Sequence, residues 1–165
     1  MGDWSGTVPT ILAGDNPSGD DWKNVLDELS AISTAWTAWT PTLGNLTLGN
    51  GTLAAVYRRV GKTLDYRFKF TLGSTSAVGS GPTFTLPTGA TLNSGIAVNV
   101  DEVGMAVLTD TGVATRLGIV LPNSSTVLTI WSFSTTGVVT GISATVPHTW
   151  GSTDVISCHG TAELA

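Results

Sequence analysis

Residues able to carry out acid–base or metal chemistry are sparse in this chain of 165 residues, which has two histidines and one cysteine. His159 directly follows Cys158 in a run that reads as a strand, so the two side chains should point to opposite faces and cannot form a dyad. His148 lies in a loop, and no third ligand stands at metal-binding spacing from either histidine. We therefore predict a non-enzymatic protein that needs no metal or other cofactor.

Two carboxylates leave carbohydrate chemistry open. A glycosidase needs two facing carboxylates, and the sequence alone does not exclude a pair such as Asp101 with Asp154. In the stretch PHTWGSTD, Trp150 stands close to Asp154, and these two residues are candidate contacts for a glycan. The alternative is that Trp150 closes the end of a β-sandwich as a plug.

The composition favours a protein that functions within an assembly. Charged residues make up 12% of the chain, about half of the share in an average soluble domain, and the net charge is −5. A surface covered by Thr, Ser, Asn and Gly instead of charges tends to associate. Basic residues form no stripe beyond Arg58-Arg59 and Arg67/Lys69, which argues against nucleic acid as a partner. No apolar run approaches the roughly 18 residues of a membrane span, and the N-terminus lacks the pattern of a signal peptide.

From residue 39 onward the pattern is that of strands and turns. Apolar residues alternate with polar ones at Leu64, Tyr66, Phe68, Phe70 and Leu72. This alternation predicts a strand with one buried and one solvated face, and Gly61-Lys62 before it predicts a hairpin turn. Eight to ten such strands with regularly spaced turns indicate a mainly β fold, a single β-sandwich or jelly-roll-like domain over residues 39–165.

A short helix is the main feature of the preceding unit, residues 1–38. Ser18 can cap a helix that runs from about Gly19 to about Thr37, and Pro41 enforces its end. Its apolar residues repeat at spacings of 3, 4, 3 and 4, at Trp22, Val25, Leu29, Ile32 and Trp36. This seam is typical of oligomerisation, and its bulky residues suit three helices better than two, so we predict a homotrimer. The same stripe would also serve a helix that lies as a lid on its own sheet.

Residues 1–17 read as an extended arm, which we expect to become ordered only against a partner. The apolar residues of this arm are the candidate contacts for docking: Trp4, Val8, Pro9, Ile11 and Leu12.

Several motifs occur in an order that resembles a known family. They are Trp39-Thr40-Pro41-Thr42, Gly49 to Leu53, Tyr57 to Thr63, Gly79 to Gly81, Phe84 to Pro87 and Thr149 to Glu163. Together they resemble a β-domain in virion proteins of tailed phages of actinobacteria. The front of the chain is similar to the segment that starts many phage tail and head-fibre proteins, at Pro9, Ala13, Gly14, Asp15, Asn24 and Asp27. Residues 93–140 carry no matching motif.

The resemblance implies a trimeric structural protein of the virion, assembled in the cytoplasm of the bacterial host. Its further partners would be the major capsid protein or a tail protein. We expect a capsid decoration or head-fibre protein, because the chain has no shaft repeats and a trimer matches the local threefold positions of an icosahedral shell. The alternative is a tail-associated receptor-binding protein that recognises a saccharide on the host cell surface.

Overall fold

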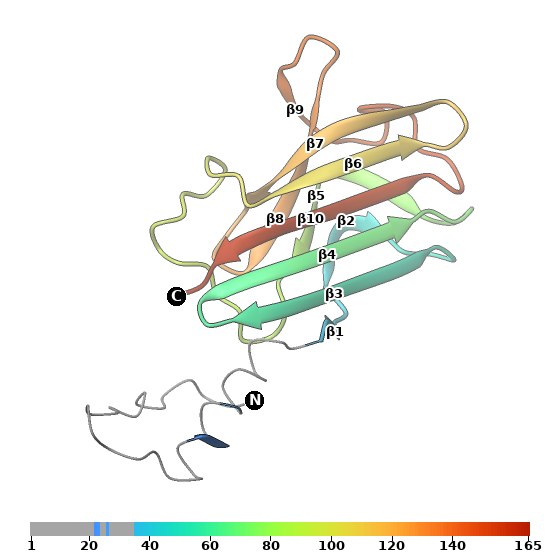
Figure 1. Cartoon of the computed structure of the whole chain (residues 1–165). Helices are drawn as coiled ribbons and strands as arrows, with labels where there is room; N and C mark the ends of the chain where they lie inside the picture. The colour runs from blue at the N-terminus through green and yellow to red at the C-terminus, as the bar shows by residue number, and fades with distance from the viewer. Residues whose placement is uncertain (1–21, 24–25, 27–34) are drawn as a thin grey trace.

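The structure is a computed structural model that describes residues 22, 23, 26 and 35–165 (Figure 1). Its strands are β1 (Thr37–Ala38), β2 (Leu43–Thr47), β3 (Thr52–Val60), β4 (Thr63–Thr71), β5 (Ala77–Thr85), β6 (Gly104–Asp110), β7 (Ala114–Pro122), β8 (Val127–Phe133), β9 (Val139–Gly141) and β10 (Val155–Glu163). The prediction of a mainly β fold with eight to ten short strands is confirmed.

All strands belong to one antiparallel sheet in the order β1-β3-β4-β10-β6-β7-β8-β5-β2, and β9 pairs with β8. The sheet curls, so that β8, β5 and β2 lie behind β4, β10 and β6 in Figure 1. Phe68 of β4 and Phe84 of β5 are not on neighbouring strands, yet their rings stack with centroids 4.4 Å apart. The two halves of the sheet therefore face each other across a shared core, as the layers of a sandwich do.

The β3–β4 hairpin follows the sequence pattern closely. Val60 pairs with Thr63 across the predicted turn, and Gly61 has a φ of +56°, which glycine adopts without steric cost. In β4 the alternate residues Leu64, Tyr66, Phe68 and Phe70 are buried, each with at most 1% of its surface exposed. The residues between them face outward, as the alternation of a half-buried strand requires.

The segment from Thr37 to Thr47 links the two ends of the curled sheet. Its first residues pair with β3 as β1, and its last residues pair with β5 as β2. Between them Trp39 donates from its backbone N–H to Ala55 O at 3.0 Å and from its indole to Thr85 O at 3.2 Å. The indole also packs edge-on against Tyr57. Trp39 thus ties both edges together, and the pairing of this segment with the sheet begins at Thr37.

The predicted helix is only partly present among the described residues. Trp22, Lys23 and Leu26 are α-helical, whereas Ala35 and Trp36 are not, and Thr37–Ala38 form β1. The prediction that the helix reaches about Thr37 and includes Trp36 is wrong, because pairing with β3 fixes the chain in an extended form there. Val25, Leu29 and Ile32 of the seam lie outside the described residues, as does the whole arm from 1 to 17. No helix among the described residues is long and apolar enough to cross a membrane.

Candidate functional site

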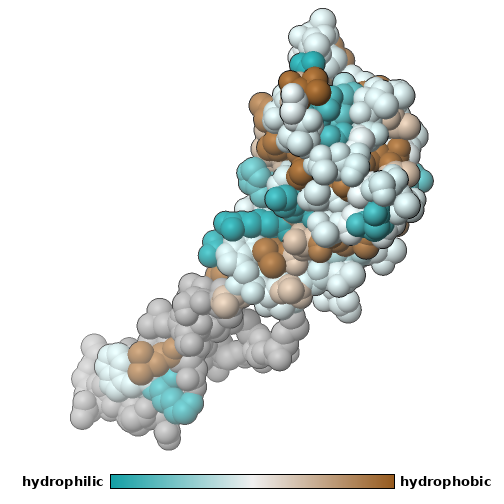
Figure 2. All heavy atoms as spheres, turned by 90° about the vertical axis from the view of Figure 1, so that its right-hand side faces the viewer, coloured by the Kyte–Doolittle hydropathy of each residue, from teal (hydrophilic) through white to brown (hydrophobic). Residues whose placement is uncertain are grey.

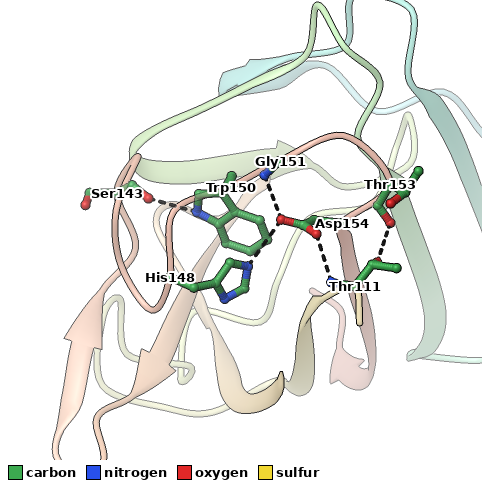
Figure 3. A network of polar contacts seen from close by, with 7 residues as sticks. All are labelled: Thr111, Ser143, His148, Trp150, Gly151, Thr153 and Asp154. Atoms are coloured by element: carbon green, nitrogen blue, oxygen red, sulfur yellow. Dashed lines mark hydrogen bonds and ion pairs between the residues drawn. The ribbon is translucent and has the colours of Figure 1, made fainter. Parts of the chain in front are cut away.

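One corner of the domain brings together His148, Trp150 and Asp154, just before β10 (Figure 3). Asp154 is 3% exposed, and both of its carboxylate oxygens are in use. Oδ1 accepts the backbone N–H of Thr111 at 2.9 Å, and Oδ2 accepts that of Gly151 at 2.7 Å. The hydroxyl of Thr111 in turn donates to Thr153 O at 2.7 Å. These bonds join the turn after β6 to the segment that leads into β10.

Trp150 closes this corner from the side. Its indole N–H donates to Ser143 O at 2.9 Å, and its ring lies against the ring of His148, with centroids 4.2 Å apart. The side chain is half-buried and packs against the core. The structure therefore brings Trp150 and Asp154 together as the sequence suggested, but it commits their polar groups to the protein itself. This geometry fits the plug interpretation, since a saccharide would have to compete for the carboxylate of Asp154.

His148 belongs to the corner through its ring contact with Trp150 and its proximity to Asp154, without a hydrogen bond. Its side chain is 11% exposed, and neither ring nitrogen makes a hydrogen bond within the described residues. Nε2 lies 3.7 Å from Asp154 Oδ2, which is too long for a hydrogen bond. Nucleophilic catalysis needs a hydroxyl or thiol in hydrogen-bond reach of such a base, and no described side chain takes that place.

The remaining chemistry-bearing residues do not converge. Asp101 precedes β6 and accepts the N–H of Ala97 at 2.7 Å, whereas Asp154 contacts Thr111 beyond the other end of this strand of 7 residues. At the usual rise per residue their separation is on the order of 20 Å, too far for a glycosidase pair. Cys158 is buried and His159 is exposed, so the prediction of opposite faces is confirmed. Burial raises the pKa of the Cys158 thiol. Among the described residues no group of three or more His, Cys, Asp or Glu could hold a metal ion.

Trp36 occupies a different position, on the outer side of the β3–β4 hairpin. The guanidinium carbons of Arg67 and Arg58 lie 4.4 Å and 5.3 Å from the centroid of its ring, within the range of cation–π attraction. We call these three residues the Trp36 clamp. Arg58 Nε also lies 2.7 Å from Asp65 Oδ2, and the Thr161 hydroxyl donates to Asp65 Oδ1 at 2.6 Å. The clamp therefore fixes the point at which the chain reaches the β-domain.

A further surface, on β6, β7 and β8, was not predicted from the sequence. Met105, Val107, Leu117, Ile119 and Trp131 lie on the outer side of these strands, and we call them the apolar face; Leu117 is exposed and the other four are half-buried. The register sets Met105, Ile119 and Trp131 opposite one another, and Val107 opposite Leu117. Leu117 has 55% of its surface exposed. Figure 2, which draws one side of the molecule, shows hydrophobic atoms in small groups on a mostly pale surface.

One signal in the sequence could have revealed the apolar face. In the runs GMAVLTD and ATRLGIVLP, apolar residues occur at both odd and even positions. A strand of this kind is apolar on both sides, so it is either covered twice or exposes one apolar side. These runs lie within residues 93–140, which carry none of the motifs of the resemblance.

Comparisons of the chain with protein-family models, with curated proteins and with solved structures give no match.

Proposed function

We propose that this protein is a non-enzymatic structural protein of a bacteriophage virion, which forms a trimeric projection on the capsid as a decoration or head-fibre protein. The observation that supports this proposal most is the apolar face on a chain with few charges. Monomeric soluble proteins rarely leave contiguous apolar surface in water, and such surface marks contacts with other proteins. The motif order from Trp39 to Glu163 adds the phage virion as the setting.

In this proposal the N-terminal unit attaches the domain to the shell. The arm residues Trp4, Val8, Pro9, Ile11 and Leu12 dock on the virion, and the helix seam contributes to the trimer. The Trp36 clamp and β1 hold the start of the β-domain against β3. A mechanical force on the N-terminal unit would therefore be transmitted to the sheet at this point. A decoration protein needs such a firm junction, because it must stay attached while its outer domain is exposed.

The proposal is tested on virions of the phage that encodes the chain. We expect mass spectrometry to find the protein in purified particles, and an electron density map to place it at threefold positions of the capsid. Particles from which the gene is deleted serve as the control and should lack this density. Absence of the protein from purified virions would refute the structural role, and density on the tail alone would refute the capsid location.

The receptor-binding alternative depends on Trp150, whose ring is half-buried in the corner. Labelled full-length protein would then stain host cells, and Trp150→Ala would remove the stain. We expect no specific staining, because the indole N–H and the carboxylate of Asp154 are already bonded within the domain. Staining that is lost in Trp150→Ala and kept in Trp39→Phe would favour the alternative over the proposal.

A further inference from the structure

The apolar face is bordered on one side by positive charge. Within residues 35–165, five of the six Lys and Arg residues lie on the β3–β4 hairpin: Arg58, Arg59, Lys62, Arg67 and Lys69. Lys69 pairs with Ser157 and Ser157 pairs with Val107, so Lys69 lies two strands, or roughly 10 Å, from the apolar face. Arg67 likewise lies two strands from Met105, with His159 between them. A partner for this surface needs apolar groups beside acidic ones.

The chain itself carries such a partner between β5 and β6. Residues 97–102 expose Val98 at 46% and Val100 at 71%, and Asp101 and Glu102 follow directly, also exposed. Asp101-Glu102 is the only pair of adjacent acidic residues in residues 35–165. We call this segment the acidic knob.

The acidic knob is held in one shape by its own backbone. Ala97 N–H donates to Asp101 Oδ2 at 2.7 Å, Asp101 N–H donates to Ala97 O at 3.1 Å, and Asn99 N–H donates to Pro122 O at 2.8 Å. The last bond fixes the knob at the end of β7, and within the described residues Val98 keeps about half of its surface exposed and Val100 most of it. A segment that is already ordered loses little conformational entropy when it binds.

We infer that the acidic knob of one copy binds the apolar face of a second copy. Val98 and Val100 lie against Leu117 and Val107 of the neighbour, and Glu102 faces its Lys69. The two surfaces of this contact differ, so each copy offers its acidic knob to one neighbour and its apolar face to another. Such head-to-tail contacts form a closed ring when the rotation that relates neighbouring copies closes on itself. A ring of three copies would be the trimer of the proposed function. The inference rests on that proposed function and identifies the surfaces through which the copies of the trimer contact one another.

Charge reversal tests this pairing in the purified full-length chain. Glu102→Lys or Lys69→Glu alone places like charges at the contact, and we expect each to raise the dissociation constant of the oligomer by roughly three- to tenfold. The double variant Lys69→Glu/Glu102→Lys restores an opposite pair and should return near the wild-type value. Leu117→Asp buries a charge and should abolish association. Sedimentation velocity at several concentrations measures the dissociation constants, and circular dichroism confirms that each variant is folded.

Lys62→Glu is the matched control, because it makes the same change of charge in the turn of the β3–β4 hairpin, away from the apolar face. It should leave the dissociation constant near that of the wild type. A wild-type chain that stays monomeric throughout the micromolar range would overturn the contact, as would a double reversal that fails to restore association. If Leu29→Asp abolishes association while the charge reversals change nothing, the helix seam is the interface. The inference would then fail and the proposed assembly role would stand, since that role is tested separately on virions.

Discussion

Asp65 shows how single residues stabilise the outer side of the sheet. Its pKa is lowered first by the hydrogen bond from the Thr161 hydroxyl and then by Arg58. A carboxyl whose folded-state pKa lies below its unfolded value stabilises the fold above that unfolded value, about 3.9 for Asp. The contribution is lost as the pH falls from there through the lower folded-state pKa. Because the pair is partly exposed to solvent, its contribution is small.

We predict that Asp65→Asn lowers the free energy of unfolding by about 0.2–1 kcal/mol near neutral pH, the range for a partly exposed pair. The difference from the wild type should shrink as the pH falls below about 4, where the wild-type carboxyl also becomes protonated. Urea unfolding at a series of pH values measures this difference. Thr161→Val is the companion variant, because removing the hydroxyl should raise the pKa of Asp65 in a carboxyl NMR titration. A constant difference across the pH range would contradict the assignment to the charge of Asp65.

At the scale of elements, the corner joins strands that are far apart in sequence. Asp154 bonds to Thr111 and Gly151, so the carboxylate holds the β6–β7 turn against the start of β10. Removal of this buried acceptor would leave two N–H groups without a partner. The resulting loss of stability is larger than the net contribution of the two hydrogen bonds, because the buried donors are left desolvated and unpaired. The side chain of Asp154 therefore holds the loop before β10 in a fixed conformation.

We predict that Asp154→Ala lowers the free energy of unfolding by about 2–4 kcal/mol, since two backbone donors lose their acceptor. The fluorescence of Trp150 should change as well, because the indole lies in the same corner. Asp110→Ala is the control: its carboxylate makes no hydrogen bond within residues 35–165, and the variant should lie within about 0.5 kcal/mol of the wild type. Urea unfolding followed by fluorescence measures both effects. Equal free energies of unfolding for the two variants would show that the hydrogen bonds of Asp154 do not stabilise the domain.

The same elements show what the sequence could and could not predict. Alternation in β4 is a local signal and predicted its buried face, and Gly61-Lys62 predicted the turn. The proximity of Trp150 and Asp154 was also visible, but the role of Asp154 depends on Thr111, 43 positions away. The helix was extended too far because its seam continues to Trp36. Long-range contacts with Arg58, Arg67 and β3 decide the conformation there, and a periodicity argument contains no information about them.

At the scale of the whole molecule, electrostatic repulsion between copies of the chain is weak, because the chain carries few charges. The calculated isoelectric point is about 4.6, and near that pH the net charge and its repulsion vanish. The apolar face is then free to drive contacts, because its attraction does not depend on ionisation.

We predict that light scattering of the wild type is greatest near pH 4.6, the isoelectric point expected from its amino-acid composition, and that Leu117→Thr lowers this maximum. The variant has no new charge and so keeps the isoelectric point, while it removes the most exposed side chain of the apolar face. Leu48→Thr is the matched control, since Leu48 is also exposed, at 37%, but lies in the turn between β2 and β3. An equal reduction by both substitutions would mean that association follows general hydrophobicity. A reduction by Leu117→Thr alone assigns it to the outer side of β6, β7 and β8.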